Sequence, residues 1–309
     1  MFSPSQLPSQ KVVFTVAQGE GVNQISQNLR NNKLINNSFI FETYVWALRS
    51  ENKIIAGRYD LYTGYNMVQI TNILMGGEVR SVDSITLIEG WNRQQYAKRI
   101  DGYGLDGQLF LDLTASTTMW RDDYPLLASI PVGQSLEGYL FPDTYALDSQ
   151  STVPFLLNRM LQTFDTRLSQ DLLDDIVAGE RTLYEVATVA SIIENEVSDS
   201  EQRRMVAGVF YNRLAIGMGL QSDATINFIT GKGQRRPSLG DLEIDSPYNT
   251  YKYRGLPPGP IGNPSLDSLT AAIRPAEHDY LYFLHNQKGE IFYARTFEEH
   301  QRNRQLYLD

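Results

Sequence analysis

Apolar residues in the first hundred positions repeat one short pattern. Before Gly19 and again before Gly90, apolar residues indicate a strand, and after each glycine, apolar steps of three and four indicate an amphipathic helix. The two copies lie about 71 residues apart. Such steps place one face of a short helix on a sheet, so the pattern predicts a small unit that occurs twice.

Between the two copies, the sequence predicts a helix at 39–48, a strand at 56–61 and another helix at 67–74. Residues 11–83 then form a small β-α-α-β module, and residues 84–135 form a second repeat and a connection. The pattern alone leaves open whether these units bind a ligand or only support the fold.

From residue 136 the chain becomes mainly helical. The most regular helix is predicted at 182–197. The Gly/Pro-rich stretch at 246–264 is predicted to lack regular structure, because its prolines fix φ and lack a backbone N–H donor. A final helix follows a hairpin. The remaining helices and the two hairpin strands are predicted at 154–164, 170–177, 201–216, 280–285 and 291–295. Together these elements predict an α+β fold with a larger mixed domain at 84–309, whose core is 136–309.

Composition narrows the classes of function. The chain has 309 residues, 42% of them hydrophobic, and its net charge of −9 argues against nucleic acid or acidic lipid as partners. It has no cysteine, and its three histidines lack the spacing of a metal site, so we expect neither thiol nor metal chemistry. The sequence has no run of about 18 apolar residues, so it predicts no membrane-spanning helix. Residues 1–10 are expected to be a linker or a cut end.

A formal dinucleotide-binding pattern, G-x-G-x-x-G, occurs at 102–107. It follows a predicted helix instead of a strand, and residues 108–113 lack a clear helical pattern. The pattern is therefore not expected to bind a dinucleotide.

Glu194 is the most specific candidate for chemistry. On the predicted helix it shares a stripe with the small residues Ala187, Ala190 and Ser191, next to the apolar stripe. A carboxyl held among apolar neighbours loses hydration and keeps its proton near neutral pH, as a general acid must. The alternative is an ordinary glutamate at the edge of a buried face. Glu196, on another side of the helix, is expected to be solvated.

Two loops carry polar and aromatic residues that suit a sugar. Gln221 and Asp223 follow the next helix, although Asp223 also fits the N-cap of a helix at 224–229. Tyrosine combines a flat apolar face with a hydrogen-bonding tip, which suits sugar rings, although tyrosines also pack under long loops. Aromatic residues crowd the two proline-containing loops at Tyr139, Phe141, Tyr145, Tyr248, Tyr251 and Tyr253.

Four long motifs, taken together, resemble the endolytic murein transglycosylase family. They read EGYLFPDTY from Glu137, ASIIENE from Ala190, GMGLQSD from Gly217, and YNTY from Tyr248 with GLPPGPI from Gly255. The resemblance runs from about residue 14 to the C-terminus in the family's own order. Two departures are Ala224, where a proline commonly stands, and Glu290, where members often have histidine.

The resemblance implies a LysM-like N-terminal module and a domain that cuts peptidoglycan glycan strands. The family's catalytic glutamate falls on Glu194. The resemblance also implies an N-terminal membrane helix, absent from this chain, that anchors the enzyme outside the cytoplasmic membrane. The chain would then be a soluble ectodomain, with cell-wall synthases (penicillin-binding proteins) as candidate partners.

A lytic transglycosylase needs one carboxylate and no metal or cofactor, because the C6 hydroxyl of muramic acid attacks its own C1. Protonated Glu194 would donate to the leaving glycosidic oxygen, and its carboxylate would then take the C6 hydroxyl proton. Candidates for stabilising the transition state or contacting sugar rings are Glu137, Tyr139, Gln221, Asp223, Asn249 and Tyr251.

Two other functions stay open. A muramidase would use Asp223 or Glu137 as a second carboxylate and water as the nucleophile. A non-catalytic peptidoglycan-binding scaffold would use the repeated units and the aromatic loops without cutting the strand.

Overall fold

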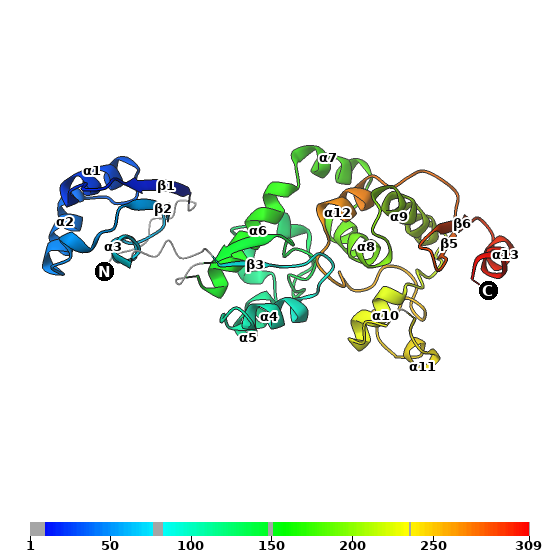
Figure 1. Ribbon diagram of the computed structural model, residues 1–309. Coiled ribbons are helices and arrows are strands. Elements are labelled where there is room, and N and C mark those ends of the chain that lie inside the picture. Colours follow the sequence, from blue (N-terminus) through cyan, green and yellow to red (C-terminus); the bar gives the residue numbers. More distant parts are fainter. Residues whose placement is uncertain (1–9, 77–82, 148–150, 235, 309) are drawn as a thin grey trace. The chain divides into compact units, whose positions relative to one another are not determined.

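The computed structural model describes residues 10–76, 83–147, 151–234 and 236–308 (Figure 1). The chain forms two compact units that divide between Asp83 and Ser84. Apart from Gln10, the predicted linker at 1–10 lies outside the described residues.

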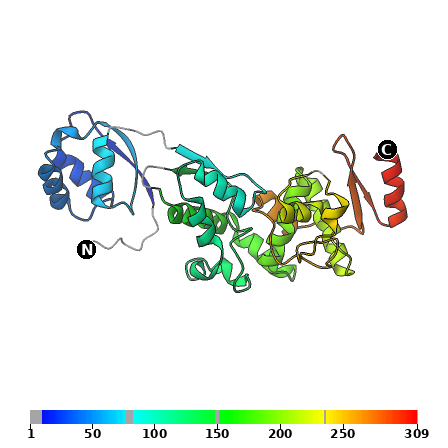
Figure 2. The same ribbon diagram turned by 90° about the horizontal axis from the view of Figure 1, so that it is seen from below.

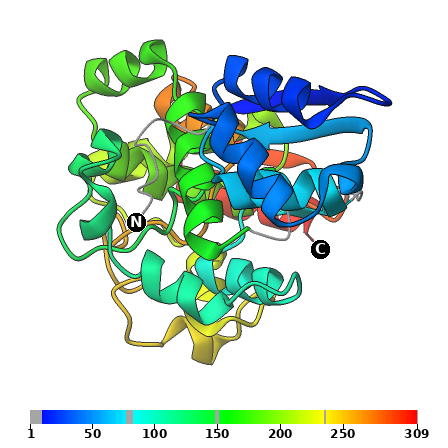
Figure 3. The same cartoon turned by 90° about the vertical axis from the view of Figure 1, so that its left-hand side faces the viewer.

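The N-terminal unit is a two-stranded antiparallel sheet with three α-helices. Its strands pair from Lys11 opposite Tyr62 to Val16 opposite Gly57, and Figure 3 brings the unit to the front. In chain order its elements are β1 (Lys11–Val16), α1 (Val22–Asn31), α2 (Ser38–Ala47), a 3-10 helix (Glu51–Lys53), β2 (Gly57–Tyr62) and α3 (Met67–Gly76).

Alternation along the strands builds the core of this unit. Phe14 and Val16 of β1 and Tyr59 and Leu61 of β2 all point inward, while their neighbours face solvent. Apolar residues from α1, α2 and α3 complete the core: Ile25, Leu29, Phe41, Val45, Ile70 and Leu74. The predicted order of strands and helices is therefore confirmed, whereas the LysM-like character of the unit stays a prediction.

The larger unit begins with the same order of elements. Strand β3 (Asp83–Thr86) is followed by α4 (Arg93–Asp101) and α5 (Gly107–Thr114), and β3 pairs with β4 (Thr144–Leu147). Two 3-10 helices, Thr118–Trp120 and Pro125–Ser129, lie between α5 and β4. Helix α5, capped by Asp106, corrects the expectation that residues 108–113 are not helical. The preceding element is a helix, as predicted, so this glycine pattern still lacks the strand that dinucleotide binding requires.

Helix α8 (Leu183–Glu196) lies at the centre of the helical part. Thr182 and Glu185 form a capping box at its start, and its whole middle section is buried. It packs against α9 (Ser200–Ala215) and α12 (Leu266–Ile273), which also pack against each other (Figure 1). The surrounding helices are α6 (Val153–Arg167), α7 (Gln170–Ala178), α10 (Asp223–Thr230) and α11 (Leu239–Leu242).

The chain ends in a hairpin and a helix, shown in brown to red at one end of the larger unit in Figure 2. Strands β5 (Tyr282–His285) and β6 (Ile291–Ala294) pair antiparallel, and α13 (Phe297–Tyr307) packs on them. The Gly/Pro-rich stretch at 246–264 has no helix or strand, as predicted. Within the ranges that the structure describes, no helix is long and apolar enough to cross a membrane.

Candidate active site

Glu194 lies in the last turn of α8, and its side chain is only 6% exposed. One carboxylate oxygen, Oε1, accepts a hydrogen bond from Arg203 Nη2 at 2.8 Å. The other, Oε2, accepts from the backbone N–H of Ser265 at 2.8 Å and from the Ser265 hydroxyl at 2.5 Å. The stripe of small residues predicted apolar surroundings for this carboxyl. Tertiary packing instead surrounds it with three donors that hold it in a defined orientation.

Arg203 connects Glu194 to two other elements. Its side chain is 9% exposed, and Nη1 lies 2.6 Å from Asp267 Oδ2 on α12. Its Nε donates to the carbonyl of Val197, just beyond the end of α8. A buried guanidinium is tolerated only when its donors and its charge are matched, and this arginine meets both requirements.

The segment from Ile261 to Ser265 holds the site together. The N–H of Ile261 donates to Ser191 Oγ at 3.0 Å, one turn before Glu194 on α8. Asn263 donates from Nδ2 to Glu137 Oε1 at 2.9 Å, and Ser265 contacts Glu194. This segment therefore brings Glu137 and Glu194, far apart in the sequence, to one region of the molecule.

The backbone at Gly90, where the second copy of the strand pattern ends, requires a glycine. Its φ of +76° favours glycine, and a Cβ on it would lie 3.2 Å from Glu194 Cγ. Its N–H also donates to the carbonyl of Asn263 at 2.8 Å. The turn after β3 thus approaches the candidate catalytic side chain closely.

Glu137 is a second buried carboxyl, with 6% exposure. Its oxygens accept from the backbone N–H of Arg93 at 3.0 and 3.1 Å and from Asn263. Burial raises the pKa of Glu137 to about 7, although the hydrogen bond from Arg93, the charge of Arg93 and the bond from Asn263 act in the opposite direction.

A pocket of about 590 Å³ opens beside Glu194 in the larger unit. Arg203 and Ser265, which both bind Glu194, form part of its wall. Glu89 also lines the pocket. The pKa of Glu89 is raised mainly by burial and, to a smaller extent, by the charge of Glu194. The other lining residues are Phe141, Pro142, Asp143, Arg167, Leu266, Asp267 and Thr270.

Two predicted substrate-binding residues belong to the scaffold. Tyr139 is 0% exposed and packs edge-on against Phe164, with ring centroids 5.4 Å apart. Asn249 is also 0% exposed, and its Nδ2 donates to the carbonyls of Leu242 and Ile244 at 2.8 Å each. Both side chains therefore pack inside the loops that surround the site.

The other three predicted residues lie close together at the start of α10, and none of them lines the pocket described above. The Tyr251 hydroxyl donates to Asp223 Oδ1 at 2.6 Å. Gln221 is exposed, has a φ of +47°, and donates its N–H to the carbonyl of Thr250. Gln221 is exposed, and Asp223 and Tyr251 are half-buried, so their side chains can contact a polar ligand.

Glu196 links this second group to α8. Its carboxylate accepts from Ser222 Oγ at 2.5 Å, and burial raises its pKa, so this side chain is half-buried and hydrogen-bonded where a solvated one was expected. Ser222 is also the N-cap of α10, because its hydroxyl accepts from the N–H of Ala224. Asp223 is therefore the first residue of that helix and not its cap.

Sequence reasoning missed several residues of the site. Ser265 had a detectable signal, since a serine between a proline and an apolar helix is a typical N-cap. Glu89 precedes the glycine of the repeat. Arg203 and Asn263 had no signal, because their roles arise only where α9 and the 261–265 segment pack against α8.

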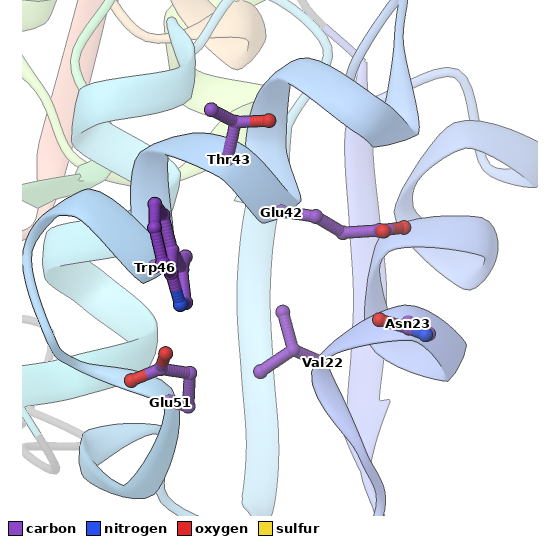
Figure 4. Close-up of a pocket in the computed structure, with 6 residues that line it drawn as sticks. All are labelled: Val22, Asn23, Glu42, Thr43, Trp46 and Glu51. Atoms are coloured by element: carbon purple, nitrogen blue, oxygen red, sulfur yellow. The ribbon is translucent and has the colours of Figure 1, made fainter.

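The N-terminal unit has its own smaller pocket, of about 270 Å³ (Figure 4). Trp46 of α2, 70% exposed, and Glu51 line one side, and Asn23 of α1 lines the other. Glu42 accepts a hydrogen bond from Ser26 within this unit. Val22 and Thr43 complete the lining.

The fold and the site define an α+β protein with a buried carboxylate–arginine pair beside an open pocket. The model of the YceG-like family matches residues 14–306, nearly the whole chain. The chain therefore belongs to the YceG-like family, as the four motifs predicted.

Known relatives cover most of the chain. The endolytic murein transglycosylase of Bacillus subtilis (strain 168) is 31% identical over 323 residues, which cover 100% of this chain and 88% of the relative. The endolytic murein transglycosylase of Streptococcus pneumoniae serotype 2 (strain D39 / NCTC 7466) is 33% identical over 318 residues, or 94% of this chain. The chain spans only 57% of that pneumococcal relative's length.

The fold is also similar to a solved structure. A crystal structure of a YceG-like protein from Listeria monocytogenes is 34% identical, with a TM-score of 0.65. The similarity covers 96% of this chain and 99% of that one.

Proposed function

We propose that this chain is an endolytic peptidoglycan lytic transglycosylase with Glu194 as its single general acid and base. It would cut the β-1,4 bond between MurNAc and GlcNAc in nascent strands, leave a 1,6-anhydro-MurNAc end and so terminate elongation. The observation that carries the proposal is the Glu194 carboxyl, which is held by Arg203 and Ser265, two residues that line an open pocket. The names of the two bacterial relatives agree with it.

The reaction can be written with one carboxyl group. Protonated Glu194 donates to the leaving oxygen of GlcNAc as the glycosidic bond breaks, which leaves an oxocarbenium-like centre at C1 of MurNAc. The C6 hydroxyl of the same sugar attacks C1, and its proton returns to Glu194. Between these steps Glu194 is a carboxylate, the form that its contacts with Arg203 and Ser265 stabilise.

Positioning supplies much of the rate. An internal nucleophile replaces an attack by free water, so the enzyme mainly needs to hold the sugar in the reactive geometry. The exposed Gln221 and the half-buried Asp223 and Tyr251 are our candidates for holding the glycan further along the strand. Glu137 is a candidate for positioning the site through Asn263.

The substrate also indicates where the enzyme works. Glycan strands are made on the outer face of the cytoplasmic membrane, so we place the enzyme there, anchored by an N-terminal helix and near the synthases. The β-α-α-β order of the N-terminal unit supports a LysM-like role in glycan binding.

Replacement of Glu194 tests the proposal directly. Glu194→Gln keeps the shape of the side chain but cannot exchange the proton, so cleavage should fall by about 10²-fold or more while glycan binding persists. Glu201→Gln is the matched control, because Glu201 lies on the neighbouring helix α9 with its side chain 82% exposed. Both variants are incubated with purified glycan strands, and new chain ends are identified by mass spectrometry.

The products separate the candidate functions. New internal 1,6-anhydro ends from the wild type and the control, but not from Glu194→Gln, support the lytic reaction. Reducing ends would favour a muramidase with a second carboxylate. Binding without any new ends would favour a scaffold and refute the proposal.

A further inference from the structure

One guanidinium lies between two carboxylates in the candidate active site. Arg203 Nη2 lies 2.8 Å from Glu194 Oε1, and Arg203 Nη1 lies 2.6 Å from Asp267 Oδ2. The arginine and Glu194 side chains are 9% and 6% exposed, whereas Asp267 is 42% exposed. Asp267 therefore joins the buried pair to the open pocket.

This arrangement solves a charge problem that general acid catalysis creates. If Arg203 were paired with Glu194 alone, protonation of Glu194 would leave a buried guanidinium without a counter-charge, which is costly. Asp267 keeps Arg203 neutralised when Glu194 carries its proton. When Glu194 gives the proton away, Arg203 already lies in contact with the new carboxylate.

We propose that Asp267 is a positioning residue that acts through Arg203 to let Glu194 hold its catalytic proton. The inference rests on the proposed function, because it assigns a role to the proton that the lytic reaction transfers. Asp267 does not touch the reacting bond in this account. It sets how strongly Arg203 competes with the proton for Glu194.

Two other titratable groups interact electrostatically with Glu194. Glu89, on the turn after β3, interacts electrostatically with Glu194, Arg203 and Asp267. Tyr96 of α4 also interacts with Glu194, and burial is the main cause that raises its pKa. Asp267 differs from both because it is in direct contact with Arg203, and it also accepts from Ser200 Oγ at 2.9 Å at the start of α9.

Asp267→Asn is the decisive variant. Removal of this charge leaves the positive charge of Arg203 directed at Glu194, so Glu194 loses its proton at lower pH. The basic limb of the kcat/KM profile should then move to lower pH by about one unit, the size expected when a neighbouring charge is removed. Asp267→Glu keeps the charge and should restore most of the wild-type profile.

The matched control is Asp175→Asn. Asp175 is also paired with an arginine, Arg274, and is 40% exposed, but it lies on α7 and does not line the pocket. It should leave the profile unchanged. A wild-type profile in Asp267→Asn, in a protein that still cuts glycan to anhydro ends, overturns the inference and leaves the proposed function intact.

A second measurement does not depend on activity. The carboxyl carbon of Glu194 is followed by ¹³C NMR against pH and assigned by its absence in Glu194→Gln. A lower titration midpoint in Asp267→Asn supports the coupling between Asp267 and the Glu194 proton, and an unchanged midpoint refutes it. If the midpoint moves but the wild type makes no anhydro ends, the proposed function fails and the coupling stands without a catalytic role.

Discussion

The buried carboxyl of Glu137 makes the stability of the larger unit depend on pH. Its pKa is about 7 in the folded chain, against an ordinary value of 4.5, and burial is the main cause. Below pH 4.5 both the folded and the unfolded chain hold the proton. As the pH rises from about 4.5 through about 7, the unfolded chain releases the proton while the folded chain still holds it, so the folded state loses stability over this range. At about 1.4 kcal/mol per pH unit the total loss is about 3 kcal/mol.

Glu137→Gln removes this dependence. Glutamine does not titrate, and its carbonyl oxygen can still accept from the N–H of Arg93 and from Asn263. We therefore expect the free energy of unfolding of the variant, relative to the wild type, to rise by about 3 kcal/mol between about pH 4 and pH 8.

Guanidinium unfolding followed by tryptophan fluorescence measures this change. The chain has three tryptophans, and Trp46→Phe leaves only Trp91 and Trp120, both in the larger unit. Glu201→Gln, an exposed carboxyl on α9, is the control and should show no such change. If Glu137→Gln and the wild type differ by the same amount at both pH values, the assigned burial penalty is wrong.

Three further changes test the packing around the site. Asn263→Ala would leave the N–H groups of Gly138 and Leu140 and the Glu137 carboxyl without this partner, so thermal unfolding should show a loss of about 3 kcal/mol. Gly208→Ala would place a Cβ 2.4 Å from the carbonyl oxygen of Ala276 and should destabilise by about 2 kcal/mol or more, whereas Gly240→Ala, whose nearest atom is 3.9 Å away, should not. Ser265→Ala removes the hydroxyl that donates to Glu194 and caps α12. We expect kcat to fall about 10-fold or more and the free energy of unfolding to fall by about 1 kcal/mol. An unchanged kcat would contradict the role given to this hydroxyl.

Local signals in the sequence predicted most of the longer elements. Steps of three and four predicted α8, and the apolar residues before Gly19 and at 56–61 predicted the strands of the N-terminal unit, because such patterns follow from helix and strand geometry. The short helices α5, α11 and α12 were not predicted, since eight residues or fewer give a pattern of little more than two turns at most. Glu194 was found because its helix is regular and its neighbours are small.

The surroundings of Glu194 were decided only by tertiary structure. Its partners come from α9 and from the segment before α12, and pairing across such distances leaves no trace in local periodicity. The same reason explains Tyr139 and Asn249, whose residue types suit a sugar but whose side chains the loops bury completely. Residue type and local pattern therefore determined which groups could do chemistry, while packing between distant elements decided which of them face the pocket and which charges they meet.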